Sequence, residues 1–190
     1  MSSTTALTIA VVVIVVLIVA LIVVSYGRHR RTSELKRQFG PEYDRAVGEQ
    51  PSRRAAERDL EQRQRRHDEL ELKELDPRQR QRYAEQWERM QAHFVEEPEA
   101  ATREADELVT MVMHERGYPT EDFDARVQNL SVDHAETLGH YREAHEINQV
   151  NERGQASTEQ LRQALMHYRL LFAELLGDTS GGGRPIPRHG

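Results

Sequence analysis

The chain has 190 residues, no cysteine and a formal net charge of -6. This length suits one modest domain plus an anchor, and the lack of cysteine excludes disulfides, thiolate metal sites and a cysteine nucleophile. The charge is uneven, because residues 28–82 carry 16 Lys and Arg against 12 Asp and Glu, whereas residues 83–190 carry 10 against 20. A basic segment suits anionic lipid headgroups, and an acidic one argues against a nucleic-acid footprint. We therefore expect no nucleic-acid partner.

Residues 6–24 form an uncharged apolar run, ALTIAVVVIVVLIVALIVV. At about 1.5 Å per residue, a helix of this length spans the roughly 30 Å hydrocarbon core of a bilayer. The alternative is a signal peptide cleaved after Ser25. Against it, the first five residues lack a basic n-region, and the run exceeds the usual h-region of about 7 to 15 residues. The sequence predicts an extracytoplasmic N-terminus over residues 1–5 and a transmembrane helix over residues 6–26, with the lipid bilayer as its partner.

Basic residues follow the apolar run and indicate its orientation. They are Arg28, Arg30, Arg31, Lys36 and Arg37, whereas the only positive group before the run is the terminal amine. Short flanks rich in Lys and Arg stay in the cytoplasm. We therefore expect a single-pass protein of the cell membrane with a cytoplasmic C-terminal domain.

The segment LKRQFGPEYDRAV, residues 35–47, predicts an elbow between two helices. Gly40 suits the end of a helix because glycine enters the left-handed region, and Pro41 suits the first turn of the next helix. Phe39 and Tyr43 flank the bend, and we expect them to pack on each other, on the distal domain or on the bilayer surface. Residues 52–75 predict a further helix with few apolar anchors, typical of a solvated stalk. Residues 27–75 are thus predicted to be a charged helical stalk.

Residues 76–177 predict a bundle of four or five helices, which makes the fold class all-α. Apolar residues recur at helical spacing in several stripes. The stripes are Tyr83, Trp87, Met90 and Phe94; Ala101, Ala105, Leu108 and Val112; Phe123, Val127 and Leu130; Leu138, Tyr141 and His145; and Leu161, Leu165, Tyr168, Phe172 and Leu175. Aromatic stripes at this spacing are typical of a core, although the first could also line a partner groove.

Local signals predict where these helices begin and end. Expected starts are Asp76-Pro77, Pro98, a cap at Thr120, a cap at Asp133 and the capping box Ser157–Gln160; expected ends are Gly117 and Gly177. The last residues, 178–190, are rich in Gly and Pro and are predicted to be disordered.

Nine histidines raise the question of a metal site. His114-Glu115 and His145-Glu146 each begin the zincin signature H-E-x-x-H, but Tyr118 and Gln149 occupy the final positions. No Glu lies three residues before a His, which excludes the motif of di-iron bundles.

The remaining cluster is Glu136, His140 and Glu143 on one helical face, which we interpret as a solvated, salt-bridged surface. His145 is interpreted as a packed histidine. No serine lies in a nucleophile elbow, and Gly181–Arg184 lacks the strand and helix of a phosphate loop. We therefore expect no catalytic, cofactor-binding or metal-binding residues, no cofactor and no enzymatic activity.

Three stretches resemble a family of small actinobacterial membrane-anchored proteins without an assigned activity. They are RQFGPEYDRAV from Arg37, ERGYPTEDFDARVQNLSVDHAETLGHYREAH from Glu115, and ASTEQLRQALMHYRLLFAELL from Ala156. The resemblance implies membrane association and a bacterial origin, and it supplies no catalytic or cofactor residues.

The predicted function is a noncatalytic scaffold or adaptor that binds another protein at the inner face of a bacterial membrane. The alternatives are an exported or envelope-facing protein of the same architecture and an unrecognised enzyme. An open groove along the helical stripes would favour binding, whereas a closed core with a polar pocket would favour chemistry.

Overall fold

The computed structural model describes residues 3–177. Within its first helix, side chains at residues 3–13, 15, 20, 23, 24, 27 and 28 lie outside this description. The predicted disordered tail, 178–190, also lies outside it, as do residues 1–2 of the predicted N-terminal segment. Residues 3–5 of that segment belong to the first helix.

Over the described residues the regular structure is all α-helix, as predicted. The helices are α1 (Ser3–Phe39), α2 (Pro41–Glu49), α3 (Arg53–Asp68), α4 (Pro77–His93), α5 (Pro98–Glu115), α6 (Phe123–Asp133), α7 (Ala135–Glu152) and α8 (Thr158–Leu176). The five helices α4 to α8 fall within the predicted bundle.

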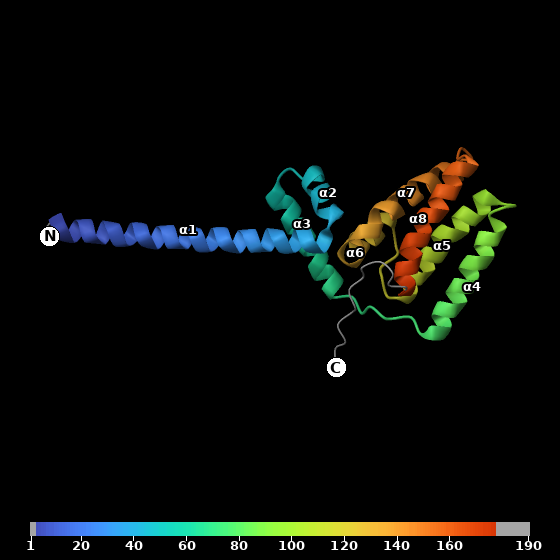
Figure 1. The fold of residues 1–190 in the computed structure, drawn as a ribbon, viewed down its shortest axis with the longest axis horizontal. Helices are drawn as coiled ribbons and strands as arrows, with labels where there is room; N and C mark the ends of the chain where they lie inside the picture. Colours follow the sequence, from blue (N-terminus) through green and yellow to red (C-terminus); the bar gives the residue numbers. More distant parts are fainter. Residues whose placement is uncertain (1–2, 178–190) are drawn as a thin grey trace.

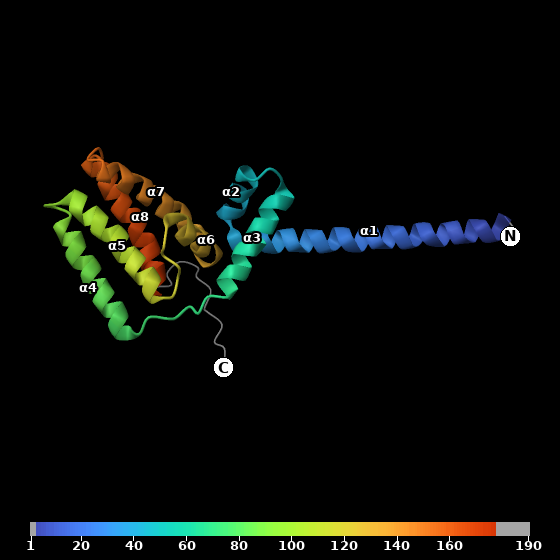
Figure 2. The same ribbon diagram turned by 180° about the vertical axis from the view of Figure 1, so that it is seen from behind.

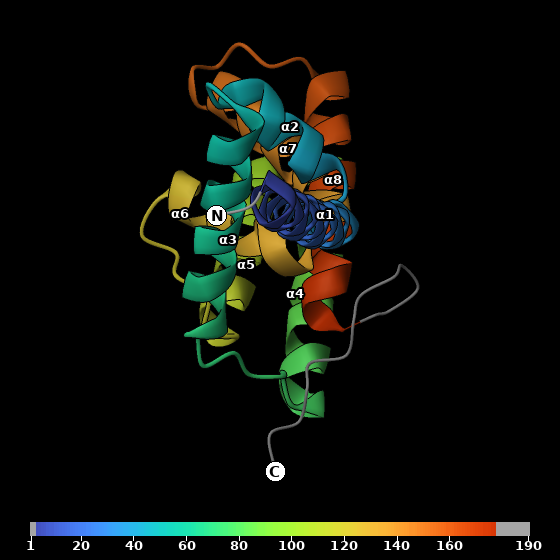
Figure 3. The ribbon, with the colours of Figure 1, turned by 90° about the vertical axis from the view of Figure 1, so that its left-hand side faces the viewer.

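Helix α1 is a single unbroken rod that projects away from the rest of the molecule (Figures 1 and 2). Only its C-terminal end contacts the body, where α2, α3 and α6 surround it in the view along its axis (Figure 3). Across the part of the chain that the structure describes, no helix combines the length and apolar character needed to cross a membrane.

The larger core lies between α4, α5, α7 and α8. Trp87 of α4 stacks on Phe172 of α8 with ring centroids 4.6 Å apart, and Met90 is fully buried. Tyr83 and Phe94 are partly buried against the same core. The first aromatic stripe therefore faces the core, and it does not line an open groove.

A second, smaller core joins the end of α1 to α2, α3 and α6. Its buried members are Leu35, Phe39, Tyr43, Ala46, Ala56, Leu60 and Val132. Helix α3, which the sequence suggested was a solvated stalk, is therefore packed on one face against α2 and α6.

The predicted helix over residues 52–75 is wrong beyond Asp68. Residues 71–76 have no regular structure and pass over the end of α5. There Lys73 N–H donates to the Arg116 carbonyl at 2.9 Å, and a Cβ on Gly117 would lie 2.8 Å from the Glu71 carbonyl oxygen. Leu70, Leu72 and Leu75 pack on the larger core. Burial of these leucines stabilises the irregular conformation more than the helix propensity of the segment would stabilise a helix.

Two predicted caps are also wrong. Asp122, and not Thr120, caps α6 by accepting a hydrogen bond of 2.6 Å from Ala125 N–H. Asp133 is the last residue of α6, and His134 occupies the cap position of α7 without a side-chain capping bond.

The other helix boundaries predicted within residues 76–177 are confirmed. Asp76 and Ser157 both form complete capping boxes, with Gln79 and Gln160 as their partners. Gly117 and Gly177 follow α5 and α8 with φ of 92° and 86°. Tyr118 folds back after Gly117, as its N–H bonds to the Met113 carbonyl at 3.0 Å.

Candidate functional site

The elbow at Gly40 is a fixed corner between α1 and α2. Gly40 has φ 45° and ψ -124°, and its N–H bonds to the Lys36 carbonyl at 3.0 Å, so α1 ends there. Pro41 begins α2, as predicted. Phe39 and Tyr43 are 0% and 2% exposed in the smaller core, so the structure places both rings inside the protein.

The elbow is docked on α7 by polar contacts. A Cβ on Gly40 would lie 2.8 Å from Glu136 Oε1, so the glycine allows close approach of the two segments. Next to it, the buried Glu42 carboxylate accepts hydrogen bonds from both terminal nitrogens of Arg142, one of them at 2.6 Å. These contacts couple the direction of α1 to the bundle.

Tyr118, His134 and Glu174 form a chain of hydrogen bonds between the α5–α6 loop, the α6–α7 junction and α8. His134 Nδ1 lies 2.8 Å from Glu174 Oε2, and its Nε2 lies 3.3 Å from the Tyr118 hydroxyl. Thr137 donates to the same Glu174 oxygen at 2.9 Å. The order carboxylate, imidazole, hydroxyl is that of a nucleophile relay.

The environment of Tyr118 argues against such a relay. Its side chain is 2% exposed, so a substrate has no access to the hydroxyl. Burial and the nearby Asp133 carboxylate raise the pKa of Tyr118, which is the reverse of activation. These hydrogen bonds are therefore structural, and they join the α5–α6 loop, the α6–α7 junction and α8.

His67 and Asp133 extend this network to α3. His67 Nε2 lies 3.0 Å from Asp133 Oδ2. Burial alone would raise the pKa of Asp133, but the contact with His67 and the charges of His134 and Arg116 hold it below the ordinary value. The pair fastens the end of α3 to the end of α6.

Asp106 of α5 is the centre of a second polar group. His145 Nδ1 lies 3.9 Å from Asp106 Oδ1, and the His145 ring stacks on Phe123 at 3.8 Å. Burial opposes ionisation of Asp106, yet His145, Tyr168 and the Arg126 charge hold its pKa below the ordinary value. The structure thus places His145 as a packed histidine against α5 and α6.

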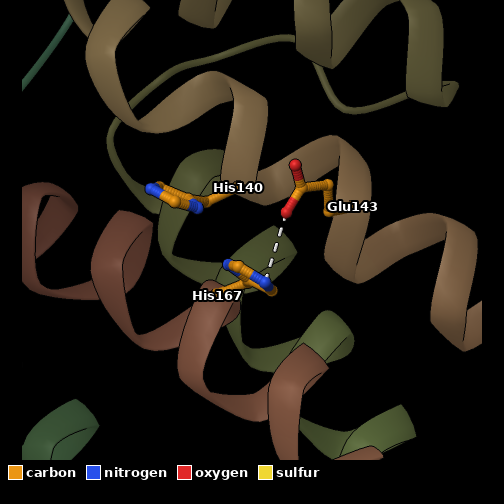
Figure 4. A group of neighbouring side chains, drawn as sticks. All are labelled: His140, Glu143 and His167. Atoms are coloured by element: carbon orange, nitrogen blue, oxygen red, sulfur yellow. Dashed lines mark ion pairs between the residues drawn. The ribbon is translucent and has the colours of Figure 1, made fainter. Parts of the chain in front are cut away.

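A third group of titratable side chains lies between α7 and α8 (Figure 4). His140 and Glu143 of α7 face His167 of α8, and each offers a ligand atom within 4.8 Å of the others. His167 Nε2 lies 3.2 Å from Glu143 Oε2, and the two imidazole rings stack at 4.8 Å. Glu136, which the sequence grouped with His140 and Glu143, lies instead against Gly40.

Burial lowers the pKa of His167, the Glu143 carboxylate opposes this shift, and the neighbouring His140 adds to it. Ligand spacing within one helix does not reveal His167, because His167 lies on α8 whereas His140 and Glu143 lie on α7. A signal was available, since the tripeptide His-Tyr-Arg occurs at residues 140–142 and again at 167–169. The two copies face one another, with Tyr141 and Tyr168 edge to face at 6.1 Å.

An open pocket of about 380 Å³ lies between α3 and α6, and its lining includes Arg63, Arg66, Pro119, Gln128 and Asn129. Apart from Glu69, its charged groups are guanidinium ions, so it offers no arrangement for nucleophilic catalysis.

No protein-family model, curated protein or solved structure matches the chain. A functional assignment therefore rests on the residues of this chain.

Proposed function

We propose that the protein is a noncatalytic, single-pass membrane protein that holds its helical body at the inner face of a bacterial membrane as a protein-binding scaffold or adaptor. The observation that carries the proposal is the rigid connection between an exposed apolar rod and a folded body. A membrane adaptor needs an anchor and a folded body, and the body must be held at a fixed orientation relative to the anchor.

The membrane part of the proposal rests on the sequence of residues 6–24 and on the exposure of side chains within it. The large apolar side chains described there are between 50% and 69% exposed: Ile14, Val16, Leu17, Ile18, Val19, Leu21 and Ile22. These residues occupy nearly every position from 14 to 22, so they cover all sides of the helix, and α1 is a rod that projects away from the body (Figure 1). Helices that are apolar on every side are typical of lipid surroundings.

The orientation rests on the residues that follow. Tyr26 is 64% exposed, and the Arg30 guanidinium lies 5.5 Å from the centroid of its ring. An aromatic ring with adjacent arginines is typical of the boundary between hydrocarbon and headgroups. The excess of Arg and Lys after the span supports a cytoplasmic body.

The scaffold part rests on the elbow. Helix α1 continues unbroken from the apolar segment to Phe39, whose ring is fully buried in the smaller core. The ion pair of Glu42 with Arg142 then ties the elbow to α7. A body connected in this way has a defined distance and direction relative to the membrane.

The noncatalytic part rests on the environment of two buried tyrosine hydroxyls, Tyr118 beside His134 and Tyr168 beside Asp106. Burial raises the pKa of Tyr118 and of Tyr168, and both rings are at most 2% exposed. A buried tyrosine hydroxyl with a raised pKa is a poor nucleophile and a poor acid.

Membrane fractionation with a topology reporter tests the proposal. We expect the full chain to stay in the membrane after alkaline carbonate washing, and a reporter active only in the cytoplasm, fused after Gly190, to work. Ile14→Arg with Ile18→Arg should release the protein, since each arginine at a span centre costs about 2.5 to 3.5 kcal/mol. The matched control, Ile14→Leu with Ile18→Leu, should remain in the membrane.

Two results would overturn the proposal. Extraction of the parent by carbonate would exclude an integral anchor, and a mature chain beginning near Tyr26 in the medium would show an exported protein. The scaffold role is tested by proteins that co-purify from detergent-solubilised membranes with the parent and the leucine control. The co-purifying proteins should be absent when the Ile14→Arg, Ile18→Arg variant is purified in the same way.

A further inference from the structure

The group formed by His140, Glu143 and His167 differs from the other histidine sites in the described residues. It combines two imidazole rings and one carboxylate from two adjacent helices (Figure 4). We propose that these three side chains bind one Zn²⁺ ion, with a fourth position left to solvent. The proposal does not depend on membrane anchoring or on the scaffold role.

The distances between the candidate ligand atoms are close to those in a zinc site, so small side-chain movements would allow metal binding. Zn²⁺ binds His nitrogen and carboxylate oxygen at about 2.0 to 2.2 Å, so tetrahedral ligand atoms lie about 3.5 Å from one another. The candidate atoms of the three residues already lie within 4.8 Å. Rotations about side-chain torsions can close the difference of about 1 Å without moving either helix.

The helices that carry the site are fixed by their own packing. His140 and Glu143 lie one turn apart on α7, and His167 projects from α8, which packs along α7. Directly after the two histidines, Tyr141 and Tyr168 are fully buried and contact edge to face. This contact sets the register of the two helices, and a site on rigid elements holds its ligands with little loss of entropy.

The state of the ring nitrogens favours a cation between the residues. His140 Nδ1 and His167 Nδ1 are both buried, and neither has a hydrogen-bond partner in the protein. Buried polar atoms are normally satisfied, so two such nitrogens on stacked rings need an explanation. Two protonated rings at this distance would repel, whereas a shared cation is attracted by both rings and by Glu143.

The donor set selects the kind of cation. Imidazole nitrogen suits zinc and its neighbours in the transition series, whereas Mg²⁺ and Ca²⁺ prefer a shell of oxygen atoms. Two histidines and one glutamate with an open position are a known zinc ligand set. The Glu143 side chain is 61% exposed, so the ion can enter from solvent.

Zinc binding to the purified full chain in detergent tests the proposal. After treatment with a chelator, Zn²⁺ is added in competition with a chromophoric chelator, and Co²⁺ serves as a spectroscopic probe of coordination. We expect one equivalent of Zn²⁺, and His140→Gln, Glu143→Gln and His167→Gln should each weaken binding by at least about tenfold, the scale seen when even supporting residues are lost. Visible absorption of the Co²⁺ protein should fall in the same variants.

The matched controls are His93→Gln and His114→Gln, which change exposed histidines outside the group and should bind Zn²⁺ like the parent. Because Glu143 is mostly exposed, Glu143→Gln should fold even if a histidine variant does not. Zn²⁺ should also raise the melting temperature of the parent and of both controls, and at the same Zn²⁺ concentration this rise should be smaller in Glu143→Gln. Equal affinity in Glu143→Gln and the parent, or no saturable binding by the parent, would overturn the proposal.

Discussion

Glu42 and Arg142 form an ion pair that connects the elbow after α1 to the middle of α7. Both terminal nitrogens of Arg142 donate to the two carboxylate oxygens, and the side chains are only 5% and 11% exposed. A carboxylate and a guanidinium removed from water to this extent depend on one another, because either one alone is a buried, unpaired charge.

We expect Glu42→Ala or Arg142→Ala to destabilise the protein by about 3 to 5 kcal/mol. The double variant should cost less than the sum of the single changes, since it leaves no unpaired charge. Denaturant unfolding of the four proteins in a double-mutant cycle measures this difference. Additive losses would show that the two residues act independently.

Gly40 provides a second test of the elbow. Its φ is 45°, and a Cβ added there would lie 2.8 Å from Glu136 Oε1, so Gly40→Ala meets backbone strain and a close contact. With ψ at -124°, Gly40 lies outside the left-handed helical region, and the strain of a side chain there should lower the free energy of unfolding by roughly 1 to 3 kcal/mol. Glu136 adds less, because the end of a flexible side chain can move.

The control for this substitution is Gly48→Ala in α2, where a Cβ has no neighbour within 4 Å. There alanine should stabilise the helix by roughly 0.5 to 1 kcal/mol. The two glycines therefore predict opposite shifts in denaturation midpoint. A gain at both positions would contradict the assignment of Gly40 as a strained corner.

The sequence predicted those features whose causes are local. Asp76 with Gln79, and Ser157 with Gln160, form capping boxes whose hydrogen bonds span only three residues. The stripe containing Trp87 is likewise a property of one helix. The all-α class and most boundaries in the bundle follow from signals of this kind.

Features that depend on contacts between helices were missed. Residues 69–75 have helical composition, but Leu72 and Leu75 pack on the larger core and the Glu71 backbone lies against Gly117, so the segment is not helical. Asp133 is of a residue type that favours the N-cap position, but its carboxylate pairs with His67 of α3. His167 lies beside His140 and Glu143 because α8 packs along α7. The spacing of residues along one helix cannot predict this contact between two helices.

Trp87 tests whether the aromatic stripe contributes to the core. Its side chain is 6% exposed and stacks on Phe172, so Trp87→Ala should destabilise the full chain by about 3 to 5 kcal/mol. Val95→Ala is the control, because Val95 is 86% exposed and its loss should change stability by less than about 0.5 kcal/mol. Thermal unfolding that is unchanged in Trp87→Ala would reopen the possibility of a partner groove.

The pKa of Asp133 predicts how stability depends on pH. Its folded pKa lies below 3.8, the ordinary value that applies in the unfolded chain. The carboxylate therefore contributes stability that is complete well above pH 3.8 and is lost as the pH falls through the folded pKa. Asp106, whose pKa is also lowered, should add to the same loss in acid.

His67→Gln separates the contribution of Asp133 from that of other carboxylates. Without the imidazole beside it, the pKa of Asp133 should move back towards 3.8, and the acid-dependent loss of stability should become smaller. His93→Gln is the control, since His93 is exposed and should leave the pH profile unchanged. Urea unfolding at a series of pH values from neutral into the acid range measures both profiles. Parallel profiles for His67→Gln and the parent would show that His67 does not set the pKa of Asp133, and the link between α3 and α6 would then rest on apolar packing alone.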